Sequence, residues 1–357
     1  MYNPAFNYKP LFPQAFRVCT DENGVVFVTF SDDFKGRLEE TFTYLGYIAH
    51  DENSHIAYLR SKLLALIGPW ESEYLFDLAS GRRGKGVVVF DNLPFEPIIW
   101  SPALGMPPHS AKATSLSEHL LLAISTFFGE AYGVAKEGNR LVNDLIPSKE
   151  DLDKLTGNGS RMPLGLHTEN AALRFAKPGF DWSPKGLLLG EVSEQKVGRP
   201  KTMVSIASKA CALLPNQAVT ILRRPCSRLG LPIRQRTGET KKSAIGPVPI
   251  ILGADGKEEV IAAFYGDMMR PINAKALWAV GLLNEKLDEV AFGIPIVPGR
   301  IVYLANGRVL HGRSDFNPIF DENGRAQRWI QRVFVCARLD AFNGCRALTD
   351  RVFDVML

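Results

Sequence analysis

Residues 165–170 read Gly-Leu-His-Thr-Glu-Asn, and both the fold and the chemistry of the chain can be approached from this stretch. It follows a glycine-containing loop at 156–160 and predicts a short β-strand. Side chains alternate between the two faces of a strand, so His167 and Glu169 face one side and Thr168 faces the other. An imidazole and a carboxylate held side by side offer two ligands for a metal ion.

A third ligand is available at His311, within residues 306–313, which read Asn-Gly-Arg-Val-Leu-His-Gly-Arg. Two histidines and one carboxylate on one face of a metal ion, with open positions opposite, are the arrangement of non-haem Fe(II) oxygenases. The pair His-x-Glu alone is common by chance and also fits the solvated face of a strand. The metal site is favoured by the later half of the pattern, where His-Gly-Arg is followed by Arg-Trp-Ile-Gln-Arg at 328–332.

Taken together, these stretches resemble the clavaminate synthase-like branch of the Fe(II)/2-oxoglutarate oxygenases. That branch is related to taurine dioxygenase and includes hydroxylases of free L-arginine, L-asparagine and L-lysine. Each matching segment is weak alone, but the segments occur in the family's order and are specific as a set: 164–170, 201–203, 311–313 with 315–318, and 328–332. The resemblance implies a double-stranded β-helix (jelly-roll) core that uses Fe(II), 2-oxoglutarate and O2.

The resemblance also implies roles for individual residues. His167, Glu169 and His311 would be the metal ligands and would carry the catalysis. Arg328 would bind the distal carboxylate of 2-oxoglutarate, as the arginine before the tryptophan does in relatives. Thr202 would donate a second hydrogen bond to the same carboxylate, although threonine at this place also fits ordinary strand propensity.

One departure from the family pattern leaves a competitor for Arg328. Arg325 lies closer to the family's usual spacing from the distal histidine, whereas Arg328 has the matching sequence context. We prefer Arg328 and interpret residues 321–324 as a loop insertion. An arginine suits this role because its planar guanidinium donates two parallel hydrogen bonds to a carboxylate.

Further residues are candidates for binding the substrate. Arg332 lies four residues after Arg328, on the same face of the strand, and relatives use an arginine there for the α-carboxylate of an amino acid. Asn143 is a candidate for a polar substrate contact, but strand alternation alone does not decide between Asn143 and Asp144. Asp267, with Asp144 as the alternative, would hold a basic side chain. The expected substrate is therefore L-lysine or L-arginine, hydroxylated at C3 or C4.

Glu169 also predicts the type of reaction. Halogenating relatives carry glycine or alanine at this position and so leave room for chloride. A carboxylate closes that position, so we expect hydroxylation with release of succinate and CO2. Two alternatives stay open: the same iron core acting on a peptide-linked residue or another small metabolite, and a non-catalytic jelly-roll binding protein.

Composition limits the class of protein. Of 357 residues, 46% are hydrophobic and 22% charged, which is an ordinary globular balance. The net charge of +4 is too small to favour a nucleic-acid partner. Five cysteines without a Cys-x-x-Cys pair indicate a reducing compartment. The first residues lack a basic stretch followed by an apolar one, so we expect no signal peptide, and no apolar run approaches the length of about 18 residues that a membrane span needs. We therefore expect a cytoplasmic protein with a small-molecule substrate and no membrane partner; a homo-oligomer is left open.

We expect a single domain over 1–357, mainly β with helical decorations: an N-terminal helical and strand decoration at 1–83, and a jelly-roll core with inserted lid loops at 84–340. Ser115 and Glu118 have the spacing of a capping box at the start of a helix, and His119 on that helix is interpreted as a surface or packed residue. Periodicity predicts helices at 33–45, 53–67, 70–80, 115–129, 205–214 and 273–290, strands at 25–30, 84–94, 141–147, 186–192, 300–306 and 333–337, and a hairpin of 250–252 with 259–265.

Overall fold

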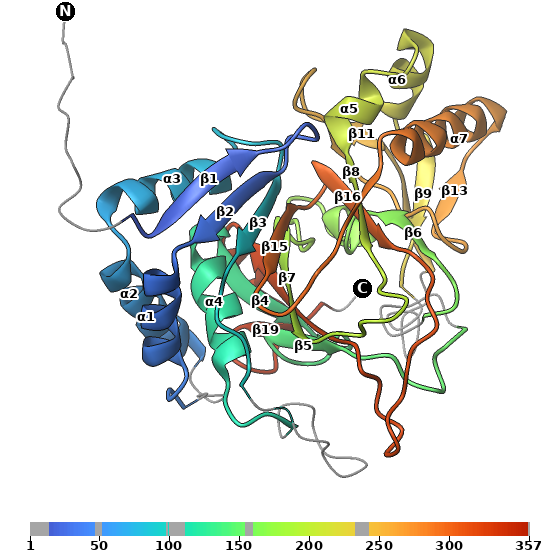
Figure 1. The fold of residues 1–357 in the computed structure, drawn as a ribbon. Helices are drawn as coiled ribbons and strands as arrows, with labels where there is room; N and C mark the ends of the chain where they lie inside the picture. The colour runs from blue at the N-terminus through green and yellow to red at the C-terminus, as the bar shows by residue number, and fades with distance from the viewer. Residues whose placement is uncertain are drawn as a thin grey trace, which may run out of the picture.

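The computed structural model describes residues 14–46, 52–97, 99, 111–153, 160–232 and 243–355. Its centre is a pair of β-sheets, a large one and a small one, with helices packed on their outer sides (Figure 1). Inward-facing residues of both sheets, such as Leu189 and Val204, belong to one buried apolar cluster. The two sheets therefore face each other across a shared interior, and this interior holds the candidate site.

The large sheet runs β1-β2-β3-β15-β7-β17-β4-β19-β18, and β5 also pairs with β17. Most neighbouring strands are antiparallel, whereas β2–β3 and β19–β4 are parallel. The central strand β7 is buried along almost its whole length, as a strand covered on both faces must be. The strands are β1 (Phe16–Thr20), β2 (Val26–Phe30), β3 (Val87–Asp91), β4 (Glu130–Val134), β5 (Val142–Leu145), β7 (Gly186–Ser193), β15 (Ile301–Ala305), β17 (Trp329–Cys336), β18 (Arg346–Ala347) and β19 (Val352–Asp354).

The small sheet runs β14-β8-β16-β6, and all its pairings are antiparallel. Beside it lie a three-stranded sheet in the order β10-β9-β13 and a hairpin of β11 with β12. The strands are β6 (Leu164–His167), β8 (Thr202–Ile206), β9 (Ser227–Gly230), β10 (Ala244–Val248), β11 (Ile251–Leu252), β12 (Glu259–Val260), β13 (Met269–Pro271), β14 (Phe292–Ile294) and β16 (Val309–Arg313).

Two groups of helices cover the outer faces of the sheets (Figure 1). The first four pack their apolar faces on the large sheet, where Phe34 and Leu120 join Val88 and Val333 in one core. The later helices pack on the small sheet, and Leu283 joins Leu310 there. The helices are α1 (Asp32–Phe42), α2 (Glu52–Leu66), α3 (Pro69–Ala79), α4 (Leu116–Phe128), α5 (Ala207–Cys211), α6 (Asn216–Leu222) and α7 (Ala274–Glu289), with 3-10 turns η2 (Ala171–Arg174) and η4 (Leu339–Phe342).

The predicted elements are present with shifted ends, but some expectations are wrong in detail. Helices contribute nearly as much as strands, so they are more than decorations of a mainly β fold. The helix expected over 205–214 ends at Cys211, and His311 lies on its own strand, β16. The capping box at Ser115 does not form, because Ser115 makes no side-chain cap and Glu118 turns to buried Lys112 instead.

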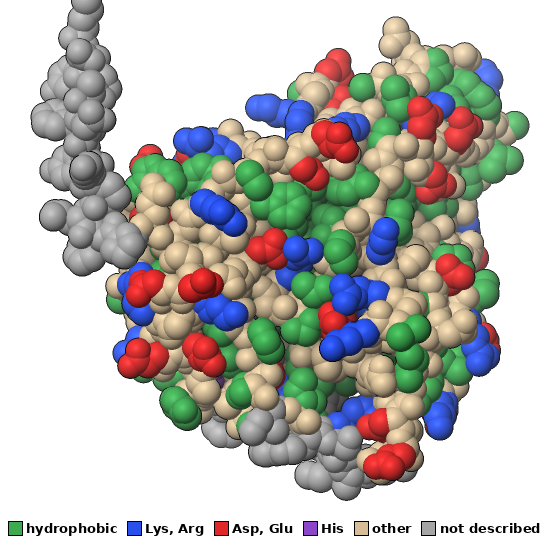
Figure 2. Space-filling model, in the orientation of Figure 1, with side chains coloured by type: hydrophobic (Ala, Val, Ile, Leu, Met, Phe, Trp, Pro, Cys, Tyr) green, Lys and Arg blue, Asp and Glu red, His purple; other side chains and the backbone are tan. Residues whose placement is uncertain are grey.

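Lysine and arginine side chains are interspersed with acidic and apolar ones over the face shown in Figure 2. No helix in the described part of the chain is long and apolar enough to cross a membrane.

Candidate metal centre

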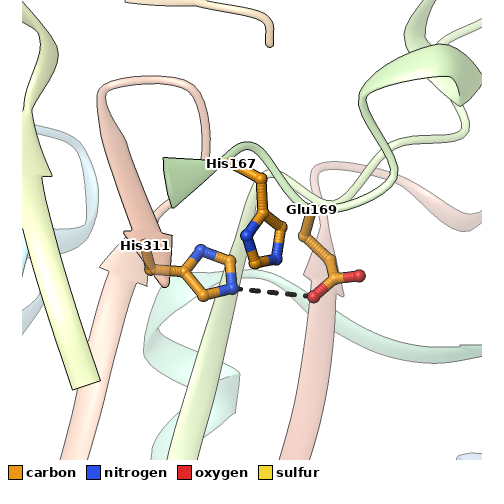
Figure 3. A group of neighbouring side chains, drawn as sticks. All are labelled: His167, Glu169 and His311. Atoms are coloured by element: carbon orange, nitrogen blue, oxygen red, sulfur yellow. Dashed lines mark ion pairs between the residues drawn. The ribbon is translucent and has the colours of Figure 1, made fainter. Parts of the chain in front are cut away.

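His167, Glu169 and His311 meet in the interior between the two sheets (Figure 3). Strands β6 and β16 are neighbours, and their register places His311 directly opposite His167. The two imidazole rings are 4.3 Å apart between centroids, and His311 Nε2 lies 3.7 Å from Glu169 Oε2. One ligand atom from each residue lies within 4.8 Å of the others, and all three residues are buried.

The turn after β6 aims Glu169 at the histidines. Thr168 faces the opposite side, as strand alternation predicts, and its hydroxyl donates to the carbonyl of Val260. The backbone N–H of Glu169 donates to Asn306 Oδ1 over 2.8 Å, and Asn306 Nδ2 donates back to the Glu169 carbonyl over 3.1 Å. Asn170 then takes a left-handed conformation (φ 51°) that turns the chain away. These bonds fix the carboxylate before any ligand arrives.

The protonation states of His167 and Glu169 suit a metal ion. Burial, together with the neighbouring His311, lowers the pKa of His167 to about 3, so its imidazole is neutral at pH 7. His167 Nδ1 lies 2.9 Å from the Gly165 carbonyl, which selects the tautomer that leaves Nε2 free to bind a metal. Burial alone would raise the pKa of Glu169, but Arg332 and the histidines outweigh it and hold the pKa below its usual value.

Two imidazoles and one carboxylate on one side of a metal ion form the donor set of a 2-His-1-carboxylate Fe(II) site. Metal-ligating histidines usually have their second nitrogen held by an acceptor, as His167 does with Gly165. The ring of Tyr265 packs edge-on against His167 with centroids 5.2 Å apart and closes another side of the ligand. The residues present therefore fit Fe(II).

Arg328 and Thr202 approach the same interior from opposite sheets. Arg328 immediately precedes β17 and is 8% exposed. Thr202 begins β8, lies opposite Arg313 of β16 and is buried. The competitor Arg325 lies outside the strand, in a turn where its backbone N–H donates to Asp321 Oδ1. The turn at 321–324 is the loop expected from the sequence, and it places Arg328 at the start of the strand.

Arg332 contacts both the metal ligand Glu169 and a residue that the sequence did not indicate. Its Nη1 donates to Glu169 Oε2 over 2.8 Å, and its Nη2 lies 3.3 Å from Glu137 Oε2. The Glu137 side chain is completely buried. Asn143 lies opposite Arg332 on β5, and neither polar atom of its amide has a partner among the described residues. The interior therefore holds a cation, an anion and an unsatisfied amide beside the metal ligands.

The two acidic candidates for a basic side chain lie elsewhere. Asp144 was wrong as an alternative, because it alternates to the outer face of the sheet, where Trp329 Nε1 and Gln331 Nε2 donate to it. The Asp267 side chain is 55% exposed and pairs with Arg270 at 2.6 Å. It follows Tyr265 by two residues, on a loop that borders the site.

No motif in the sequence points to Glu137, and only an indirect signal points to Asn170. Glu137 belongs to the short turn after β4, which has no motif, and only the fold carries it to Arg332. Asn170 follows Glu169 directly, and its buried side-chain amide has no described hydrogen-bond partner. The only signal for Asn170 in the sequence was its position directly after the predicted ligand Glu169.

Comparisons with known proteins agree with this geometry. No family model matches the chain. The L-asparagine oxygenase of Streptomyces coelicolor is 24% identical over 280 residues, which cover 76% of this chain and 78% of that protein. The L-lysine 3-hydroxylase of Catenulispora acidiphila is 26% identical over 274 residues, which cover 74% and 70% of the two chains.

A solved structure of asparagine oxygenase with Fe(II), (2S,3S)-3-hydroxyasparagine and succinate has the same fold, with a TM-score of 0.78. The match covers 92% of this chain and 99% of that one at 20% identity. Sequence likeness over three-quarters of the chain, the shared fold and the buried His-Glu-His group converge on one family. The chain thus resembles the clavaminate synthase-like Fe(II)/2-oxoglutarate-dependent oxygenases in sequence, and within them the amino-acid hydroxylases; it shares their fold and has a His-Glu-His group that could hold the metal.

Proposed function

We propose that the protein hydroxylates C3 of a free L-amino acid with a basic side chain, L-lysine or L-arginine, within a single jelly-roll domain. In the overall reaction O2 and 2-oxoglutarate are consumed, one oxygen atom enters succinate and the other enters the hydroxylated product, and CO2 is released. Bound Fe(II) supplies the activation of O2 that no side chain can provide. The residues of the chain bind and orient the two organic molecules.

The observation that carries this proposal is the buried pair of Arg332 and Glu137 beside Glu169. A free amino acid has both an α-carboxylate and an α-ammonium group, and this pair offers the opposite charge to each. A peptide-linked residue has neither charged group at the backbone positions, so it would gain neither of these charge-assisted contacts. The pair therefore favours a free amino acid over a peptide.

The position of Arg332 also favours attack close to the backbone of the amino acid. Because Arg332 touches a metal ligand, an α-carboxylate bound to it lies at the metal end of the pocket. The carbons nearest the carboxylate are then closest to the reacting centre, and C3 is the first unactivated one. Two similar proteins involve the same carbon: one is an L-lysine 3-hydroxylase, and the solved asparagine oxygenase contains bound 3-hydroxyasparagine.

At the other end of the cosubstrate, Arg328 and Thr202 are the proposed partners of the distal carboxylate of 2-oxoglutarate. The Arg328 guanidinium is buried, and burial lowers its pKa to about 10, so it remains charged at pH 7. A buried cation is stabilised when an anion arrives, and a guanidinium can grip both oxygens of a carboxylate. Asn143 and Asp267 stay candidates for the amino acid itself, with Asp267 as the partner of a basic side chain.

Succinate release, measured with each of the twenty L-amino acids, tests the proposal directly. We expect the largest coupled turnover with L-lysine or L-arginine, and a product that carries one added oxygen atom at C3 by mass spectrometry and NMR. An Arg332→Met variant should lose substrate-dependent turnover while still binding 2-oxoglutarate. L-asparagine as the best substrate would overturn the basic side chain only, whereas turnover of a blocked peptide but of no free amino acid would overturn the substrate class.

A further inference from the structure

A second buried carboxyl group, Glu191, faces the Arg328 end of the interior. On β7 the apolar residues Leu187 and Leu189 point into the cluster between the sheets, whereas Leu188 points to the outer core. Alternation places Glu191 on the inner face with Leu189. The register pairs Glu191 with Ile330, two residues after Arg328 and on the same inner face. Glu191 therefore lines the proposed pocket for the cosubstrate.

This pocket contains two arginines. The guanidinium carbons of Arg328 and Arg313 lie 5.2 and 5.5 Å from the centre of the Phe316 ring. Arg313 comes from the small sheet and Arg328 from the large one, so the pocket is built from both sheets. Burial, and then the charge of Arg328, lowers the pKa of Arg313 to about 10. Two buried cations so close together favour the arrival of an anion.

The Glu191 carboxylate could be that anion, but its surroundings do not stabilise the ionised form. No carboxylate among the described residues lies within ion-pair distance of Arg328, and Glu191 Oε2 has no hydrogen-bond partner there. Burial raises the pKa of Glu191 to about 8, although Arg328 acts in the opposite direction. The nearby Glu194 raises it further and Arg199 lowers it, but these two pair with each other at 2.9 Å. At pH 7 the Glu191 carboxyl is mostly neutral.

We propose that Glu191 is an internal competitor of the cosubstrate: as a carboxylate it pairs with Arg328, and as a carboxylic acid it leaves Arg328 to the distal carboxylate of 2-oxoglutarate. The inference rests on the proposed position of 2-oxoglutarate at Arg328. A neutral Glu191 adds no negative charge to a pocket that must receive one. Its hydroxyl can also donate a hydrogen bond to the incoming carboxylate, which an ionised group cannot do.

The affinity for 2-oxoglutarate should fall as the pH rises, because binding and ionisation of Glu191 are linked. Because the bound anion disfavours ionisation of Glu191, binding of 2-oxoglutarate is coupled to uptake of a proton. The affinity for 2-oxoglutarate is then fully present below about pH 8 and is lost as pH rises above it, by up to about tenfold per pH unit. A Glu191 with a purely structural role would change affinity equally at every pH.

Calorimetry of 2-oxoglutarate binding to the Fe(II)-loaded protein under nitrogen measures this coupling without turnover. We expect the wild-type dissociation constant to rise between pH 8 and 9, and titrations in two buffers of different ionisation enthalpy to report uptake of a proton. Glu191→Gln should bind with near wild-type affinity at pH 7 and show a flat profile up to pH 9. Glu194→Gln is the matched control: it should keep the proton uptake and the fall in affinity, shifted to slightly lower pH because Glu194 no longer raises the pKa of Glu191.

Two further outcomes separate this inference from the proposed function. If Arg328→Ala weakens binding but Glu191→Gln keeps the wild-type slope, Glu191 is not the competitor and the position of the cosubstrate stands. If Arg328→Ala binds 2-oxoglutarate as tightly as the wild type, the position at Arg328 and the inference fall together. The two-buffer measurement needs no variant, so absence of proton uptake by the wild type overturns the inference even if Glu191→Gln does not fold.

Discussion

At the scale of single residues, His311 carries the prediction that tests the metal centre most directly. Its imidazole faces His167 across two paired strands and lies near Glu169, so its removal leaves only two ligands. We expect His311→Ala to lose its bound iron, as measured by metal analysis, and most or all of its 2-oxoglutarate turnover, as measured by succinate release. Full activity of this variant without added imidazole would show that the metal, if any, is bound elsewhere.

Arg328 and Arg325 form a matched pair of variants. Arg328 is buried at the start of β17, whereas Arg325 lies in the preceding turn. Loss of a buried charge-assisted pair costs about 2–5 kcal/mol. We therefore expect Arg328→Ala to raise the KM for 2-oxoglutarate by at least about thirtyfold, and Arg325→Ala to leave it nearly unchanged. Lysine at 328 should restore binding only in part, because a point charge cannot form a bidentate pair. A large effect at Arg325 alone would reverse the assignment.

The grouping of His167, Glu169 and His311 could be predicted from the sequence because short-range rules apply to these residues. Alternation along a strand places His167 and Glu169 together without knowledge of the fold, and the distal histidine belongs to a recognisable motif. Glu137 could not be found in this way. Its contact with Arg332 joins residues far apart in the sequence and depends on how β4 and β5 pair with β17. The pairing of β5 with β17 also places Asn143 opposite Arg332 on the inner face and Asp144 on the outer face, a choice that strand alternation alone left open.

At the scale of elements, β17 separates two polar environments. Its inner face presents Arg332 to the site, and its outer face presents Gln331 to a buried network below helix α4. In that network Lys112, with a completely buried side chain, binds Glu118 and lies 3.0 Å from Glu96. Gln331 donates to Glu118 over 2.8 Å and so joins the strand to the helix. The network sets the position of the strand that carries the arginine.

Removal of Lys112 should destabilise the fold strongly. Lys112→Met leaves Glu96 and Glu118 buried without their cation, and breaking a buried pair typically costs about 3–5 kcal/mol. We expect a loss of this size in the free energy of unfolding, measured with urea. Lys286→Met is the control, since Lys286 pairs with exposed carboxylates on α7 and its replacement should leave the free energy of unfolding nearly unchanged. Equal effects of the two variants would mean that the network contributes nothing beyond a surface pair.

This network also explains why the capping prediction failed. The sequence around Ser115 fits a capping box, and the local pattern gives no reason to doubt it. In the structure Glu96 accepts from the Ser117 backbone N–H over 2.9 Å and takes the place of the expected cap. Glu118 is thereby free to bind Lys112 and Gln331. A tertiary interaction therefore replaced a local one, which no reading of residues 115–118 alone could anticipate.

At the scale of the whole molecule, the site exists only where the two sheets face each other. The small sheet supplies His167 and His311, and the large sheet supplies Arg328 and Arg332. The hydrophobic pattern predicted most of the strands that form this interior. The order of the strands could not be predicted, because it is set by pairings between distant segments, such as β3 with β15. The jelly-roll core was therefore expected from the family resemblance and not from the pattern of residues.

Metal binding should therefore stabilise the whole molecule, and this prediction can be tested without any substrate. The three ligands come together only in the folded chain, and Glu169 is tied through Arg332 to the opposite sheet. A ligand at about one hundred times its dissociation constant adds about 2.7 kcal/mol when it binds only the folded state. We expect Mn(II), which resists oxidation, to raise the urea midpoint of the wild type without changing the slope. His311→Ala should show no such rise, because two ligands do not hold the ion; an equal rise in that variant would place the stabilising metal at another site.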